Sequence, residues 1–281
     1  MKFKDMPYER VDYEKTAKKL QALTEKVRNA ATGEELWAVH QEYYQVYKDM
    51  ADAMTIAHIR HDADTSDEFY MAEQNYYDET EPKLYNLLNG YKKALYESPL
   101  RSFMEEKIGG VAFATMDNAI KSMDESVIGL MQEENALTTE YNKLIASARI
   151  PFDGQELNLS LMRPYLTDSD RSVRRRAWKA YSDYFLTVSD KLDEIYDKLV
   201  KNRTAQAKAM GCDNFVELGY RRMNRNSYGR QDVENFRRQV KEVFVPFAEK
   251  VHEIRRKRLS LDKLSYICLL YTSPSPRDRS L

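Results

Sequence analysis

A histidine–glutamate pair at positions 252–253 is the strongest candidate for catalytic chemistry in the sequence. The stretch His252-Glu253-Ile254-Arg255-Arg256 begins like H-E-x-x-H, in which two histidines one helical turn apart bind zinc and the glutamate activates water. The fifth position is Arg256, which stays protonated and cannot ligate a metal. We therefore predict that His252 and Glu253 lie on a charged helix face.

Two more histidines, His58 and His61, stand three residues apart and close to Asp62 and Asp64. Two imidazoles with nearby carboxylates are able to hold a metal ion. The spacing fixes no third ligand, so the favoured interpretation is a polar helix end. There His61 would interact favourably with the helix C-terminus, and the two aspartates would belong to the following turn and cap.

The remaining candidates are a basic run and a cysteine. The run could bind phosphate or acidic peptides, but a solvated helix face is the favoured interpretation; its members are Arg171, Arg174, Arg175 and Arg176. Cys212 follows Gly211 at a helix entrance, where the pKa of a thiol tends to fall, yet no histidine is near it in sequence, so we interpret it as structural. These residues give no complete catalytic set, and we assign no catalytic, cofactor-binding or metal-binding residue.

A long helical run over 167–210, with the segment 213–264 behind it, is predicted to organise the chain. Large apolar side chains recur in this run at steps of three and four, which keeps them on one helix face. Thr167 and Asp170 predict its N-terminal cap, and Gly211 predicts its end. We expect the apolar face to be core; its members are Trp178, Tyr181, Phe185, Val188, Leu192, Ile195 and Leu199.

Similar periodicity predicts helices before and after this run. Asp12 is a predicted helix cap, and predicted capping boxes begin at Thr32 and at Thr65. Three prolines are expected to mark helix boundaries or bends: Pro82 should kink or split its helix, Pro99 should occupy a first helical position, and Pro246 should bend the helix that begins near Gln231.

The segment 149–161 is the exception to the helical pattern. Apolar and polar residues alternate on both sides of Asp153-Gly154, a dipeptide that favours a tight hairpin turn. The predicted fold class is therefore all-α, a multi-helix array with one small β-hairpin near 149–161.

Composition limits the function classes. The 281 residues carry a net charge of −1, which gives no argument for a nucleic-acid or anionic-membrane partner. No run approaches the roughly 20 apolar residues of a membrane span. Two cysteines, Cys212 and Cys268, give no disulfide framework, and residues 1–10 show no secretory signal. We expect a cytoplasmic protein with no nucleic-acid, membrane or obligate protein partner.

Several stretches together resemble the oligoendopeptidase F family of zinc metallopeptidases, which is related to thimet oligopeptidase. The resemblance covers about residues 1–266, and its order and spacing are more specific than any one motif. The stretches are MKFKDMPY at 1–8, ARIPFDG at 148–154, RPYLTDSDR at 163–171, RAW at 176–178, KAMG at 208–211, LGYRRM at 218–223 and RLSLDKL at 258–264.

The resemblance implies a helical, clam-shaped peptidase whose deep channel admits short peptides. It implies one zinc, held by H-E-x-x-H and a downstream glutamate in the second half of the family's chain. Those ligand positions have no counterpart here, so none is carried over. The implied function is that of an N-terminal fragment of a zinc-dependent oligoendopeptidase, inactive alone. A non-catalytic helical binding module is the alternative, and a coiled-coil structural protein is a weaker one.

The same resemblance suggests a division of the chain. We expect an N-terminal helical region with the hairpin at 1–165 and the beginning of the helical peptidase domain at 166–264. Residues 265–281 have no helical period and resemble translated sequencing-adapter read-through, so we expect a non-native, disordered tail there.

Overall fold

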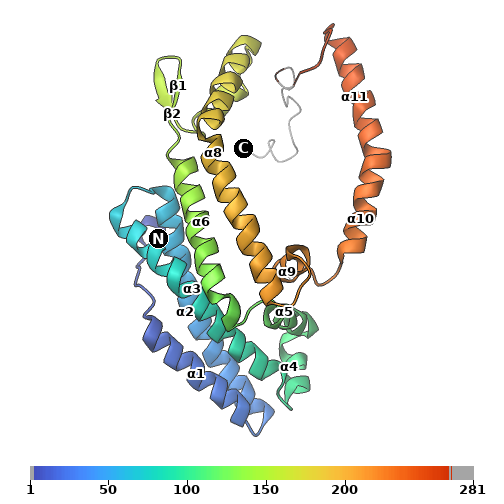
Figure 1. Cartoon of the computed structure of the whole chain (residues 1–281). Helices are drawn as coiled ribbons and strands as arrows, with labels where there is room; N and C mark the ends of the chain where they lie inside the picture. Colours follow the sequence, from blue (N-terminus) through green and yellow to red (C-terminus); the bar gives the residue numbers. More distant parts are fainter. Residues whose placement is uncertain (1–2, 266, 268–281) are drawn as a thin grey trace. The chain divides into compact units, whose positions relative to one another are not determined.

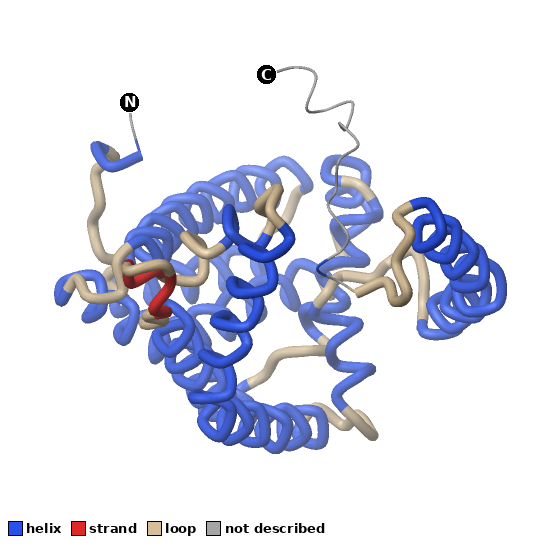
Figure 2. The backbone as a smooth tube through the Cα atoms, turned by 90° about the horizontal axis from the view of Figure 1, so that it is seen from above, coloured by secondary structure: helices blue, strands red, loops and turns tan. Residues whose placement is uncertain are grey.

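The computed structural model describes residues 3–265 and residue 267, and the predicted tail at 265–281 lies almost wholly outside them. In the described part the regular elements are all helices apart from one two-stranded antiparallel sheet (Figures 1 and 2). This confirms the predicted fold class. The chain divides into two compact units. The first comprises the residues up to 143 with 194–229, and the second comprises 144–193 with the residues from 230 on.

The first unit is built from helices that run through three-quarters of its length. Its regular elements are η1 (Phe3–Asp5), α1 (Tyr13–Asn29), α2 (Gly33–Ala63), α3 (Glu68–Tyr96), α4 (Arg101–Ile108), α5 (Gly110–Ile120), η2 (Glu125–Val127), most of α6 (Ile128–Ala146), the C-terminal part of α8 (Arg171–Ala209) and α9 (Phe215–Arg222). Helix α3 packs against α1, α2 and α5, so it is the central helix of this unit.

Local side-chain caps explain where the first helices begin. The amide of Lys15 donates to Asp12 Oδ1 at 3.0 Å, and Thr32 and Glu35 form the predicted capping box at the start of α2. The predicted box at Thr65 is wrong. Asp67 caps α3 instead, since its Oδ1 accepts from the amides of Phe69 and Tyr70 at 2.9 and 3.1 Å.

Two proline predictions also need correction. Pro82 lies buried inside α3, and the helix continues through it from Glu68 to Tyr96, so it does not split the helix. Pro99 precedes α4 by two residues, because Leu100 is the N-cap and the helix begins at Arg101. The packed faces around Pro82 hold the helix together where the ring removes one backbone donor.

The core of the first unit lies where α1, α2 and α3 meet. The apolar face of α1 is buried through Leu20, Leu23 and Val27, as its spacing predicts. Tyr43 of α2 stacks on Tyr91 of α3, with ring centroids 3.7 Å apart and planes 3° from parallel. These contacts place the polar side chains of α3 at fixed positions along its length.

The second unit contains the hairpin and the N-terminal part of α8. Strands β1 (Ile150–Phe152) and β2 (Gln155–Leu157) pair with Ile150 opposite Leu157. Asp153 and Gly154 both have positive φ, 48° and 77°, which fits the type I′ turn that Asp-Gly favours. The hairpin residues Ile150, Phe152 and Leu157 form a small core with Met162 and Ala177, and α7 (Arg163–Leu166) leads into α8.

Helix α8 differs from its prediction at one end and on its apolar face. It begins at Arg171 rather than at Thr167, because Thr167 ends α7 and Asp170 Oδ1 accepts from the amide of Ser172 at 2.7 Å. The predicted end is confirmed. Gly211 has φ +71°, and the Cys212 amide donates to the Ala207 carbonyl at 2.8 Å, as in a Schellman motif.

The apolar face of α8 is core at Ile195 only, which is 1% exposed, whereas Trp178 and the others remain half-buried. The most deeply buried positions of the C-terminal part include Asn202 and Gln206. Asn202 Nδ2 donates to the Leu130 carbonyl at 2.9 Å and Gln206 Nε2 donates to Glu134 Oε2 at 2.7 Å. Polar bonds to α6 therefore anchor this part of α8.

None of the residues in the last helices of the second unit is buried. These helices are α10 (Arg230–Gln239), the π-helical segment η3 (Val240–Phe244) and α11 (Val245–Arg258). The bend expected at Pro246 takes the form of this π turn, and Pro246 lies in the first turn of α11. No described helix combines the length and the apolarity needed to cross a bilayer. The division at 165/166 stays a prediction.

Candidate functional site

The histidine–glutamate pair of the sequence lies exposed on α11. Arg256 donates from Nε and Nη2 to the two carboxylate oxygens of Glu253, both at 2.8 Å, and Lys257 Nζ lies 3.6 Å from Glu253 Oε1. The hydrogen bonds from Arg256 lower the pKa of Glu253 to about 2. The carboxylate is thus the acceptor of a surface ion pair and too weak a base to take a proton from water.

The other histidine pair lies near the C-terminal end of α2. His61 is 1% exposed, with Nδ1 3.2 Å from Asp62 Oδ1 and with no partner for Nε2 among the described residues. Asp64 Oδ1 accepts from the Ser66 amide at 3.0 Å. Asp64 thus serves the cap and turn, as predicted, whereas Asp62 lies within the last turn of α2 and faces His61. The burial of His61 was not expected.

The described residues do not fit a zinc ion. No cluster of three or more histidine, cysteine, aspartate or glutamate side chains in residues 3–265 and 267 has a geometry able to hold a metal. Two of the candidates for such a site, Glu253 and Asp64, already accept hydrogen bonds. We therefore derive no catalytic step through zinc from these residues.

The basic run divides between two environments. Arg171 and Arg175 are exposed, and Arg176 pairs with Asp153 at 3.2 Å. Arg174 is only 5% exposed, and its Nη1 donates to the Asp168 carbonyl at 2.7 Å. For Arg174 the prediction of a solvated face is therefore wrong, because its guanidinium satisfies carbonyls of the turn before α8.

Cys212 is buried, in a small cluster with Ala207 and Leu218. Its Sγ lies 3.7 Å from Arg221 Nη1. The side chain packs where the Schellman turn at the end of α8 meets α9, which agrees with a structural role.

A half-buried ion pair that the sequence did not reveal holds the segment before α1 against α3. Glu73 of α3 is 1% exposed and accepts from Arg10 Nε at 2.9 and 3.0 Å and from the Tyr8 hydroxyl. Burial raises the pKa of Glu73, but the bonds from Arg10 and Tyr8 outweigh it and the net shift is downward. Tyr76 adds a hydroxyl bond to the Val11 carbonyl at 2.7 Å.

A second cluster lies around a cavity of about 240 Å³ between α2 and α3, lined by His58, Glu81 and Tyr85 among others. His58 Nε2 is buried without a partner among the described residues, and its ring meets Tyr77 edge-on at 5.7 Å. Burial raises the pKa of Glu81, against a hydrogen bond from Tyr85. The cavity is thus lined by an imidazole nitrogen of His58 without a hydrogen-bond partner in the described part of the chain and by the Glu81 carboxyl, whose pKa is raised.

Two family models match this chain. The model for the peptidase M3 N-terminal domain matches residues 3–123, and the model for peptidase family M3 matches residues 164–266. This chain belongs to peptidase family M3. The resemblance to oligoendopeptidase F is thereby confirmed.

Solved structures agree with membership of family M3. PZ peptidase A, determined with an inhibitor, is 40% identical, with a TM-score of 0.93 over 96% of this chain and 48% of that one. A protein described as an oligoendopeptidase F, solved at 3.1 Å, is 38% identical, with a TM-score of 0.92 over 95% of this chain and 47% of that one.

A protein described as an oligoendopeptidase F from Bacillus anthracis strain Ames is 37% identical, with a TM-score of 0.91 over 95% of this chain and 49% of that one. The M3 chain thus spans about half the length of these structures. A comparison with curated proteins gives no significant match.

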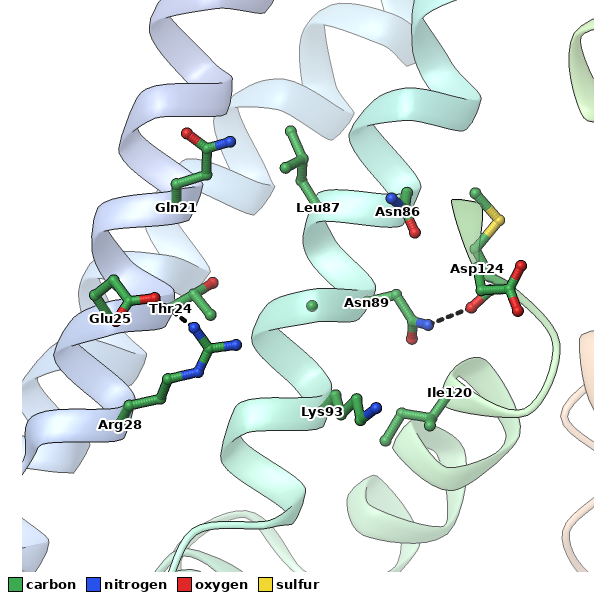
Figure 3. A pocket seen from close by; sticks show the side chains of 12 residues that line it. Gln21, Thr24, Glu25, Arg28, Asn86, Leu87, Asn89, Lys93, Ile120 and Asp124 are labelled. Atoms are coloured by element: carbon green, nitrogen blue, oxygen red, sulfur yellow. Dashed lines mark hydrogen bonds and ion pairs between the residues drawn. The ribbon is translucent and has the colours of Figure 1, made fainter. Parts of the chain in front are cut away.

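Figure 3 shows a further concave site on α3 of this M3 chain, a pocket of about 450 Å³ between α1, α3 and the segment at Asp124. Asn89 Nδ2 donates to the Met123 carbonyl at 2.7 Å, while its Oδ1 is buried without a partner in the described part of the chain. Gly90 leaves open space, since a Cβ there would meet nothing within 4 Å. Lys93, Arg28, Glu25 and Asp124 also line the pocket, and Arg28 forms an ion pair with Glu25.

Of the residues around these α3 pockets, the sequence singled out His58 but none of those that α3 itself contributes. Glu73, Glu81, Asn89 and Gly90 all fall within one predicted helix, and their surroundings are provided by the segment before α1, by α2 and by the segment at Met123. The one sequence feature that pointed to these residues was the number of polar side chains on a long helix that has to be buried on several sides.

Proposed function

We propose that this chain is part of a zinc-dependent oligoendopeptidase that hydrolyses internal bonds of short peptides, and that the chain alone is inactive. The observation that carries the proposal is the match to family M3 at both ends of the chain, combined with coverage of only 47–49% of the solved relatives. Family M3 peptidases are generally zinc-dependent. Short peptides are the proposed substrates, and a cytoplasmic location stays a prediction.

The zinc ligands of this enzyme are proposed to come from sequence other than the described residues. The reason is chemical: Arg256 takes the place of the second histidine in the histidine–glutamate stretch and ion-pairs with Glu253. A guanidinium is not a metal ligand, and a glutamate held by it does not act as the base that such sites need.

The helices of this chain are proposed to form a wall of the peptide channel. A channel wall needs a rigid frame, because substrate has to be held in a fixed geometry for hydrolysis. The packed core of α1, α2 and α3 and the ion pair of Arg10 with Glu73 supply such rigidity.

Two measurements test the proposal. Metal analysis of the purified chain after dialysis should give far less than one zinc per molecule, and an internally quenched peptide should stay intact. A chimera that joins residues 3–264 to the unmatched half of PZ peptidase A should cleave the peptide. A chimera whose motif glutamate is changed to glutamine is the matched inactive control. Stoichiometric zinc with peptidase activity in the chain alone contradicts the proposed inactivity, and an inactive but folded chimera contradicts the proposed role.

A non-catalytic binding module is the second candidate, and the exposed apolar side chains of α10, η3 and α11 favour it. Phe236, Phe244, Phe247 and Ile254 are each more than 60% exposed. Exposed surface of this kind is typical of interaction sites. Reading the gene beyond the codon for residue 266 separates the candidates, because an in-frame H-E-x-x-H supports the peptidase and its absence supports the module.

A further inference from the structure

A pocket of about 340 Å³ in the first unit has an unbalanced charge lining. It lies between α3, the segment before η2, α6 and α9. Lys92, Arg221 and Arg222 line it, and no aspartate or glutamate does so in the described part of the chain. Its volume is within the range of small-molecule sites, roughly 300–1,000 Å³.

The two arginines are held in place by the protein itself. Arg221 Nη1 donates to the Lys121 carbonyl at 3.0 Å, and its other nitrogen pairs with Glu217. Arg222 Nη2 donates to Gln206 Oε1 at 2.6 Å, and Nη1 lies 3.6 Å from Glu134 Oε2. Their charges are therefore largely offset by neighbours outside the pocket.

Lys92 is different. Its ammonium has no hydrogen bond or ion pair among the described residues, and burial lowers its pKa. An ammonium that is partly withdrawn from water without a partner costs free energy. Such unpaired, perturbed groups in pockets are candidates for ligand contacts.

Asn89 lines the same pocket one helical turn before Lys92. It is 8% exposed, its Nδ2 is committed to the Met123 carbonyl, and its Oδ1 has no partner in the described part. Figure 3 shows this side chain from the neighbouring pocket, which it also lines. A buried acceptor without a donor is also unfavourable. The pocket thus offers a cation that lacks an anion and, three residues away on the same helix face, an acceptor that lacks a donor.

We propose that this pocket binds the carboxyl end of a short peptide or of an N-acylated amino acid. The terminal carboxylate pairs with Lys92, and the amide N–H on the same α-carbon donates to Asn89 Oδ1. Met123 and Met131 also line the pocket and offer flexible apolar contacts to the terminal side chain. An inorganic phosphate lacks an N–H for Asn89 and an apolar group, so it binds less well. The choice of a peptide end rests on the proposed peptidase function.

The test is a binding measurement that needs no turnover. Calorimetry on the whole chain uses N-acetyl-leucine, its primary amide N-acetyl-leucinamide, a leucine-ended tripeptide and inorganic phosphate. We expect the two carboxylates to bind and the amide to bind at least about tenfold more weakly, because it loses a charge-assisted hydrogen bond. Tighter binding of the tripeptide than of N-acetyl-leucine assigns the pocket to peptides, and the reverse assigns it to acylated amino acids.

Adjacent lysines provide a matched pair of variants. Lys92→Met should weaken N-acetyl-leucine binding by at least about tenfold, whereas Lys93→Met, at an exposed position beside the other pocket, should leave it unchanged. Melting curves without ligand check that both variants fold. The comparison of acid with amide needs no variant at all.

Three results with the unaltered chain would overturn the proposal: no binding of either carboxylate, equal binding of acid and amide, or tighter binding of phosphate than of N-acetyl-leucine. An equal loss in Lys93→Met would move the site away from Lys92 and overturn it as well. Failure here leaves the chimera's peptidase activity untouched, and an inactive chimera leaves this binding result untouched, so the two proposals fail separately.

Discussion

Arg10 and Glu73 meet across 63 residues of chain, with Arg10 Nε 2.9 and 3.0 Å from the two carboxylate oxygens of Glu73. The Glu73 side chain is 1% exposed and the Arg10 side chain 47% exposed. The pair therefore joins a buried carboxylate side chain on α3 to a largely solvent-exposed arginine on the segment before α1. This asymmetry lets the carboxylate be tested without leaving a buried arginine behind.

Glu73→Gln should lower the free energy of unfolding by about 2–3 kcal/mol, because it removes charge-assisted bonds from a buried acceptor while solvent screens Arg10. Urea unfolding followed by circular dichroism measures the change. Glu25→Gln is the control, since the Glu25–Arg28 pair is exposed on both sides and should change the free energy by less than about 1 kcal/mol. Equal effects of the two substitutions would show that burial of Glu73 does not matter.

The same pair predicts a pH dependence. The pKa of Glu73 is lower in the folded chain than its ordinary value of 4.5, so the unfolded state binds its proton first as the pH falls. The stabilisation is fully present above the unfolded pKa and is lost as the pH falls through the folded pKa. The stability gap between wild type and Glu73→Gln should thus stay constant at neutral pH and shrink below about 4.5. A gap that widens on acidification would contradict the assigned direction.

Lys92→Met should make the unliganded protein more stable. The substitution keeps most of the apolar stem and removes an ammonium that burial disfavours, so we expect a gain of about 1 kcal/mol. Thermal unfolding measures it, with Lys93→Met as the exposed neighbour that should change little. A lower melting temperature for Lys92→Met alone would mean that the charge has a stabilising partner in solution.

Gly90→Ala should also stabilise the protein, by about 1 kcal/mol, because alanine restricts the unfolded chain and favours the helix. The new methyl meets nothing within 4 Å. Gly211→Ala is the matched contrast, since φ is +71° there and a Cβ is strained in that region. Denaturant titrations of the two variants should shift in opposite directions.

Trp178→Ala and Ile195→Ala separate the half-buried part of α8 from its buried part. Ile195 is 1% exposed, and its truncation should cost about 2–5 kcal/mol. Trp178 is half-buried, and its truncation should cost about 1–2 kcal/mol, below the range for a core aromatic. Melting curves compare them, and a larger loss for Trp178 would show that it is buried in solution.

Helix starts and stops could be predicted where the decisive contacts are local. The capping box of Thr32 with Glu35 and the turn after Ala209 involve residues within five positions of each other. Asp67 was missed because all four side chains within 64–67 are possible acceptors, and only the folded chain shows which of them meets the first free amides.

The site residues could not be predicted for the opposite reason. Glu73 is buried because Arg10 and Tyr8, more than 60 residues away, satisfy its carboxylate. Gln206 is fully buried while Trp178 is not, since Glu134 and Arg222 provide hydrogen-bonding partners for the carboxamide. A hydrophobic pattern assigns such positions to the surface, because it holds no information about partners distant in sequence.

The π turn at η3 has a consequence for whatever binds the exposed side chains around it. The amide of Val245 donates to the Val240 carbonyl, five residues back, so the turn contains one residue more than an α-helical turn. One extra residue rotates everything after it by about 100° around the axis. Phe236 and Ile254 therefore do not lie on one helix face, although α-helical spacing in steps of three and four residues would place them there. A straight groove that accepts an ideal amphipathic helix would match the apolar face of α10 or that of α11. A partner that binds both faces must follow the change in their orientation at the π turn.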